Sequence, residues 1–471
     1  MSDQPQIEDR RGVLGWVLRH PKTTIALVLL VMAILILLAL QRTAENALAR
    51  RIAAIKAKGE PTSVADLIAR QRHIPDEENM LLAVVKPAEK MVKADFPGDR
   101  DAHLRYVGMA KRTPTGQRWS NDELEAAHWY LQRFAPEIAS IHAGLRLKDS
   151  VYNVRWNTPA INAPMPELAY VRHVSKVLQL ETLTTANDSD GEKTERFLLE
   201  ALPVVHALQG DLPLIGALVE LAVKALVLDG IERSINQIGL SDAALQSADR
   251  WLRETERSPE MGAATRVERA TQLDSYRWLY STNWTRFVPV LQENDVASAV
   301  ELQTMFVDAV NAPYGVLQAR IAAIDSRADS LPREYNVSHN LIPIITGSYL
   351  RSLVLWTRGV GENRAMCGAI ACERFRLASG KWPETLAQLI PAYLDSVPID
   401  PIDGKPIRYA IIPEGIKTWT IAGDDHDEDN GGDVRRLEPY DEKFKPKDFG
   451  WVILNPELRG RAAPQTESAE K

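Results

Sequence analysis

The chain has 471 residues, more than one hydrophobic core usually covers, so two or three folded units are expected. An apolar content of 45% and a charged content of 25% are those of an ordinary globular protein, which excludes a polytopic membrane protein and a disordered chain. The formal net charge of -7 provides no basic footprint for phosphates, so we expect no nucleic-acid partner.

The first predicted element is a transmembrane helix at residues 23–40, after an N-terminal tail at residues 1–22. These 18 residues carry no charge, and a helix of that length spans about 27 Å, close to the hydrocarbon thickness of a bilayer. Ala47 and Ala49 form a small-x-small pair, which is the signature of a cleaved signal peptide. Because that pair lies well beyond the apolar run, we favour an uncleaved anchor and expect the lipid bilayer as a partner.

Residues 41–119 are predicted to be a juxtamembrane helical segment. Leu48, Ile52 and Ile55 share one helical stripe, which indicates packing on protein or on the membrane surface. The acidic run Asp76–Glu78 precedes an apolar segment, so we interpret it as the N-terminus of a helix. A catalytic carboxylate pair is the alternative interpretation of that run.

A large α-helical domain is predicted at residues 120–360. Ser120 and Glu123 form a capping box, and Pro166 and Pro213 each open a new periodic segment. The most apolar stretch, residues 214–228, contains charged residues at helical spacing, which indicates a buried core helix and no second membrane span.

The remaining chain is predicted to be a small α+β module at residues 361–455, followed by a disordered tail at residues 456–471. A helix containing Cys367 and Cys372 precedes Pro383, which opens a second, short helix. The two cysteines lie five positions apart on that helix, which predicts free thiols. Two β-rich runs, residues 408–412 and 416–422, are joined by Pro-Glu-Gly and predict a hairpin. The fold class is therefore mainly α, with one N-terminal anchor.

Part of this module resembles the globular domain of the major pseudopilins of type II secretion. The matching text runs from Phe375 to Val434 and consists of FRLASGKWP, LIPAYL, VPIDP, GKPIRY and GDD before Asp433. The resemblance implies a bacterial cell-membrane protein, with a cytoplasmic N-terminus and its bulk in the periplasm or exterior. The segment at residues 76–79, after a short anchor, is similar to that of large uncharacterised bacterial membrane proteins.

In the pseudopilin family the final loop holds calcium, and the chain carries a dense acidic run at the matching place. Six acids crowd into residues 424–433, and their mutual repulsion favours a bound cation or full solvation. Oxygen ligands without a cluster of His or Cys favour calcium. The resemblance implies Asp425 and Asp433 as ligands, with Asp427 and Asp429 as neighbours. An EF-hand-like register beginning at Asp427 and a solvated acidic turn are the alternatives.

No nucleophile motif, phosphate-binding loop or zinc-protease motif occurs in the chain, and its histidines are scattered singly. We therefore expect a membrane-tethered, non-enzymatic scaffold or interaction protein of the cell envelope, with envelope proteins as partners. The alternative is an envelope hydrolase whose site is assembled from dispersed carboxylates, with Asp122, Glu123 and Glu373 as the candidates.

Overall fold

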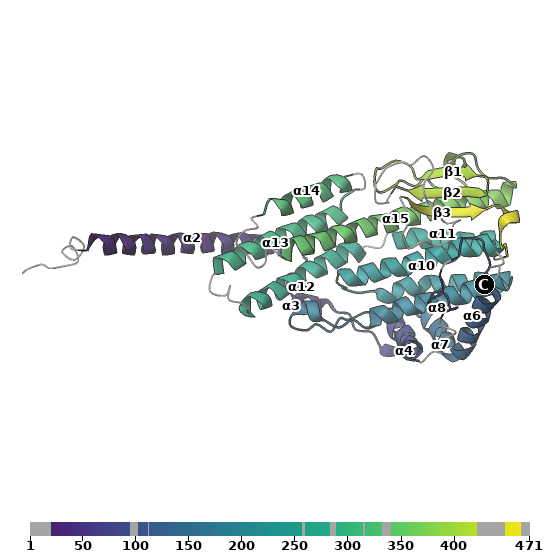
Figure 1. Cartoon of the computed structure of the whole chain (residues 1–471), viewed down its shortest axis with the longest axis horizontal. Coiled ribbons are helices and arrows are strands. Elements are labelled where there is room, and N and C mark those ends of the chain that lie inside the picture. Colours follow the sequence, from purple (N-terminus) through teal and green to yellow (C-terminus); the bar gives the residue numbers. More distant parts are fainter. Residues whose placement is uncertain are drawn as a thin grey trace, which may run out of the picture.

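The computed structural model describes residues 20–94, 102–111, 113–256, 260–282, 289–313, 316–331, 341–421 and 448–462. Within these residues the fold is mostly helical, with one long apolar N-terminal helix and a small three-stranded antiparallel sheet near the C-terminus. The predicted fold class is confirmed. Figure 1 shows an elongated body with the N-terminal helix projecting from one end and the sheet near the other.

The N-terminal half of the body begins with the end of the long apolar helix and continues through helices of 7 to 21 residues. Its helices are α2 (Pro21–Ala57), α3 (Val64–Arg70), α4 (Met80–Val92), α6 (Asn121–Arg133), α7 (Ala135–Leu145), α8 (Glu167–Asn187) and α9 (Gly191–Ala201). The acids at Asp76–Glu78 form a short 3-10 turn, η1, and Asn79 then caps α4 by accepting a hydrogen bond from the Leu81 N–H. The acidic run thus precedes a helix, as interpreted, with the cap supplied by the next residue.

The second half consists of longer helices that lie along the body (Figure 1). They are α10 (Leu214–Ile238), α11 (Asp242–Glu256), α12 (Glu260–Thr282), α13 (Pro289–Val310), α14 (Leu317–Asp329) and α15 (Leu341–Ser379). Helix α10 covers the stretch that was predicted as a core helix, and most of its side chains are buried. Helix α15 continues without a break through residues 360 and 361, so one helix belongs to both the helical region and the C-terminal region.

The sheet is ordered β1 (Arg408–Ile412), β2 (Gly415–Thr420), β3 (Phe449–Leu454). Strands β1 and β2 form the predicted hairpin, in which Ile412 pairs with Gly415 across a two-residue turn. Gly415 has a φ of 153° and its missing Cβ would lie 2.0 Å from the Ile453 carbonyl oxygen, so no side chain fits there. The short helix expected at Pro383 is a 3-10 turn, η5 (Leu386–Leu389), and begins three residues later.

The sheet packs on α15 and is joined to α10 through hydrogen bonds at the outer edge of β3. The Val452 N–H donates to Glu232 Oε1 (3.1 Å) and the Leu454 N–H donates to Asn236 Oδ1 (2.8 Å). Asn236 Nδ2 donates in turn to the Val452 carbonyl oxygen (2.6 Å). Two side chains one helical turn apart therefore occupy the edge of β3 in place of a fourth strand.

The C-terminal stretch is ordered as far as residue 462, which corrects the expectation of a disordered tail from residue 456. Pro456–Leu458 forms a 3-10 turn, η6, and the Arg461 N–H donates to the Gly116 carbonyl oxygen (2.9 Å). The Arg118 N–H donates to the Arg461 carbonyl oxygen (2.8 Å). These backbone bonds and a buried ion pair from Arg459 hold the stretch to the body. Residues 463–471 lie outside the described part of the chain.

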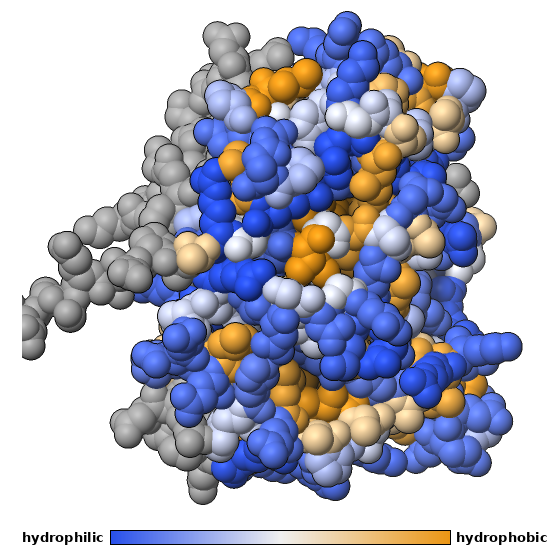
Figure 2. All heavy atoms as spheres, turned by 90° about the vertical axis from the view of Figure 1, so that its right-hand side faces the viewer, coloured by the Kyte–Doolittle hydropathy of each residue, from blue (hydrophilic) through white to orange (hydrophobic). Residues whose placement is uncertain are grey.

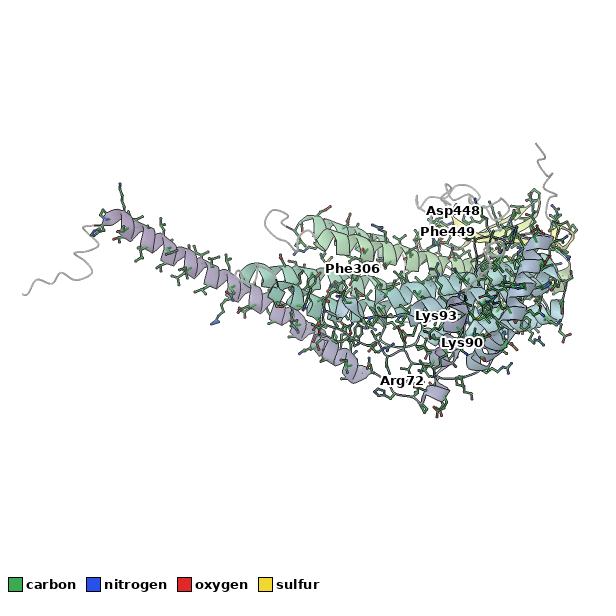
Figure 3. All side chains as sticks on the ribbon, turned by 60° about the horizontal axis from the view of Figure 1, so that its bottom comes forward. Arg72, Lys90, Lys93, Phe306, Asp448 and Phe449 are labelled. Carbon is green, nitrogen blue, oxygen red and sulfur yellow. The ribbon has the colours of Figure 1, made fainter. Side chains whose placement is uncertain are left out.

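One large hydrophobic core unites the distal half of the body, and smaller clusters fill the half nearer the anchor. The large cluster includes residues from α4, α8, α10, α11, α15 and the sheet, so the C-terminal module shares its core with the helices. A second cluster lies between α12, α13, α14 and α15, where Phe306 stacks on Tyr349 with ring centroids 4.8 Å apart (Figure 3).

Candidate functional site

Helix α2 carries the one stretch among the described residues that is long and apolar enough to cross a membrane. The most apolar 18-residue window has a mean hydropathy of 3.0, and none of that window is buried against the rest of the chain. At about 1.5 Å per residue the whole helix is roughly 55 Å long, about twice the hydrocarbon thickness. Its second half is therefore available to pack on the body.

That second half docks on α13 without an intervening loop. Ala44, Leu48 and Ile55 are buried on α2, and the last two lie in a cluster with residues of α12 and α13. The predicted apolar stripe therefore packs on protein. Figure 3 shows α2 leaving the body at an angle, with its lower half against the other helices.

Two ion pairs fix the register of the docked helix. Arg51 Nη2 lies 2.8 Å from Glu301 Oε2, and Lys58 Nζ lies 3.6 Å from Asp308 Oδ1. Glu301 also accepts hydrogen bonds from Arg327 of α14 at 3.0 and 2.9 Å, and these bonds lower the pKa of Glu301 below its ordinary value. The carboxylate of Glu301 thus joins the anchor helix to α13 and α14.

The three carboxylates considered for a hydrolase site lie on two different helices, Asp122 and Glu123 on α6 and Glu373 on α15. Asp122 is exposed in the first turn of α6, and Glu123 closes the predicted capping box with Ser120. Glu123 also pairs with the buried Arg105. These contacts give Asp122 and Glu123 places at a helix N-terminus, as the capping box predicted.

Glu373 lies on α15 and is fully buried between two arginines. Arg376 donates two hydrogen bonds to its carboxylate at 2.8 Å each, and Arg459 donates two at 2.8 and 2.9 Å. Burial by itself would raise the pKa of Glu373, but these hydrogen bonds outweigh it and the pKa lies below the ordinary value. The two bonds from Arg459 hold the C-terminal stretch to α15, and the two from Arg376 lie within that helix. The sequence pattern did not indicate this role.

A cleft lies between α10, α11, α12 and α15, where the two halves of the body meet. With its open mouth it holds about 610 Å³ of empty space, and its walls are mostly apolar, including Leu221, Met261 and Trp356. Lys224 and Glu220 form an ion pair of 2.7 Å in the wall, with side chains 16% and 6% exposed. We call this the waist cleft.

The polar groups of the waist cleft are already engaged with one another. Lys224 Nζ donates to the Thr255 carbonyl oxygen (3.1 Å), and Glu256 accepts from Arg364 (2.6 Å). The lining residues include no His, Cys, Ser or Asp, and the cleft presents apolar surface together with the paired charges of Glu220, Lys224 and Glu256. None of the three candidate carboxylates lines it.

The predicted calcium ligands Asp425, Asp427, Asp429 and Asp433 lie outside the described residues. Within the described ranges, no group of three or more His, Cys, Asp and Glu side chains is arranged to hold a metal ion. Cys367 and Cys372 are both free and buried, as predicted, and burial raises the pKa of both thiols far above the ordinary value. Both thiols therefore stay protonated and unreactive at neutral pH.

Comparisons with known proteins give no relative. No protein-family model matches the chain, and no curated protein or solved structure is similar to it. The resemblance to pseudopilins therefore rests on the residues of the C-terminal module alone. The candidate functional feature with the most structural support is the junction between anchor and body.

Proposed function

We propose that the protein is a membrane-tethered, non-enzymatic scaffold of the bacterial cell envelope, which holds partner-binding surfaces at a fixed distance from the bilayer. The observation that carries this proposal is the continuous helix α2, which passes from an apolar span into a packed junction with α12 and α13. A tether for a diffusing enzyme needs only a flexible linker. A rigid junction suits a protein whose body must keep a fixed position and orientation relative to the bilayer in order to bind its partners.

The far end of the body supplies surface for partners in this proposal. Figure 2 views the molecule from that end, and apolar patches lie there among a largely hydrophilic surface. Apolar patches with polar surroundings are the usual composition of protein interaction sites. Envelope proteins are the proposed partners.

We also propose the orientation that the pseudopilin resemblance implies, with the N-terminus in the cytoplasm and the body in the periplasm or exterior. Protease added to spheroplasts is then expected to degrade the chain after about residue 42, the end of the span. A body protected from the protease would contradict the orientation.

The acidic loop is proposed to bind calcium through Asp425 and Asp433, with Asp427 and Asp429 beside them. The crowding of six acids into ten residues supports this, since a cation relieves their repulsion.

The scaffold proposal is tested by inserting a flexible six-residue Gly-Ser linker after Gln41, which leaves the span and the packed part of α2 intact. In-cell crosslinking is expected to recover envelope partners with the native chain and to lose them with the insertion. A matched control inserts the same linker after Gln4, ahead of the span, and is expected to keep the partners.

Two results would contradict the proposal. The first is a native chain that crosslinks to no envelope protein, and the second is an insertion variant that keeps all its partners. A tethered hydrolase would keep its activity with the linker inserted, because its substrate reaches it by diffusion.

A further inference from the structure

The ion pairs between α2 and α13 determine how far each part of the body lies from the apolar span of α2. Arg51 faces Glu301 and Lys58 faces Asp308, so α2 and α13 run parallel with a constant offset of 250 positions. Each residue of α13 therefore lies at the same height along the axis of α2 as the α2 residue whose number is 250 lower. The start of α13, at Pro289, is level with the last residues of the apolar run.

Helix α12 lies antiparallel to α13, which follows it in the chain. Arg269 Nη1 donates to Thr304 Oγ1 (3.2 Å), and the Gln303 side chain donates to that of Gln272. Continuing this antiparallel register places Trp278 opposite a position near 297 of α13 and hence level with about residue 47 of α2. In Figure 1 the left-hand end of α13 lies against α2 where that helix leaves the body, and the left-hand end of α12 lies below α13.

The height of the last turn of α12 follows from the helical rise. Residue 47 lies seven positions beyond Leu40, or about 10 Å along the helix, and the level of residue 282 is about 5 Å beyond Leu40. The headgroup layer on each side of a bilayer is roughly 5 to 8 Å thick. The last turn of α12 therefore extends from within the headgroup layer, at residue 282, to just beyond the outer edge of that layer, at Trp278.

Trp278, at the start of that turn, is an exposed large aromatic side chain. Its side chain is 41% exposed, although it lies only a few residues from the buried Tyr276. Tryptophan is enriched at membrane interfaces because its ring is apolar and its N–H is polar. An exposed indole at the outer edge of the headgroup layer lies within side-chain reach of that environment.

We propose that the base of the body, comprising residues 41–47 of α2 and 278–282 of α12, rests in the lipid headgroup layer, with Trp278 as its interfacial side chain. The occupant of this surface is lipid because the surface is continuous with the span. This inference rests on the proposed membrane tether. It adds that the body stands directly on the bilayer, with no water-filled gap beneath it.

The test uses spin labels on the full chain in nanodiscs and compares their accessibility to oxygen and to a water-soluble nickel chelate. Cys367 and Cys372 are buried, so single cysteines at exposed positions take the label. Val31→Cys reports the span, Ser281→Cys reports the base with Trp278 intact, and Ala57→Cys on the distal part of α2 is the matched control. The chelate accessibility at residue 281 is expected to be several-fold lower than at residue 57 and higher than at residue 31.

Adding Trp278→Ala to the Ser281→Cys variant is expected to raise the chelate accessibility of the label, because the interfacial anchor is lost. Equal accessibility at residues 281 and 57, with residue 31 in the hydrocarbon, would overturn the base contact and leave the tether standing. A label at residue 31 that is exposed to water would overturn both. Dipolar broadening at residue 281 would assign the surface to a second copy of the chain and overturn the lipid contact.

Discussion

Replacing Glu373 with Gln removes a charge that two arginines share, Arg459 with a side chain 7% exposed and Arg376 with one 15% exposed. The side chain of Glu373 is fully buried, so water cannot replace the lost interaction. Glutamine keeps the shape of the side chain but has one acceptor oxygen in place of two. The two guanidinium groups then lack acceptors for some of their four hydrogen bonds.

The expected loss in the free energy of unfolding is about 3 to 5 kcal/mol, which is typical of removing one partner from a buried ion pair. The loss depends on pH in a defined direction. Because the pKa of Glu373 is lowered in the folded chain, its stabilisation is present above the ordinary pKa near 4.5 and is lost as the pH falls through the folded value. The two unfolding curves are therefore expected to converge in acid.

The measurement is urea unfolding of the full chain in nanodiscs at pH 7 and pH 4, followed by tryptophan fluorescence. The control is Glu457→Gln, an exposed acid in the same C-terminal stretch, which is expected to change stability by less than about 0.5 kcal/mol. If Glu373→Gln costs no more than this control, the ion triplet does not hold the C-terminal stretch. The structural account of Glu373 would then be wrong.

Two further predictions concern a buried histidine and the acidic loop. Burial, together with the charge of Lys176, lowers the pKa of His173 to about 4, so between pH 6.5 and pH 5 the unfolded chain binds a proton that the folded chain does not. The free energy of unfolding is expected to fall by about 2 kcal/mol over that interval. The variant His173→Gln can still pair with Tyr130 and is expected to remove this fall. Parallel pH profiles of the native chain and the variant would contradict this account of His173. Calcium at about 100 times its Kd is expected to stabilise the full chain by about 2.7 kcal/mol relative to chelator, and Asp425→Asn with Asp433→Asn is expected to abolish the effect. Identical melting in both buffers would refute calcium binding.

The sequence predicts well those features that depend on neighbouring residues. The long apolar N-terminal helix, the apolar stripe with Leu48 and Ile55, the capping box at Ser120 and the β1–β2 hairpin all follow from local spacing and turn chemistry, and the structure contains each of them.

Contacts between distant residues could not be predicted in this way. Glu373 and Arg459 are 86 positions apart, and Asn236 and Val452 are 216 apart. Nothing in the local sequence of Glu373 distinguishes a structural ion triplet from a catalytic acid. Likewise, β3 is too short and too apolar to be told from a buried helical segment, and its edge is completed by side chains of α10.

The claim that anchor and body form one rigid unit is tested most directly by the distance between a spin label in the span and one on α14. Val31→Cys and Ala323→Cys place the two labels at exposed positions. Ala57→Cys with Ala323→Cys gives the reference width for two labels within the body. The account predicts that the distance distribution of the first pair is single and as narrow as that of the reference pair. A broad or bimodal distribution for the first pair, with a narrow reference, would show a hinge in α2 and contradict the account.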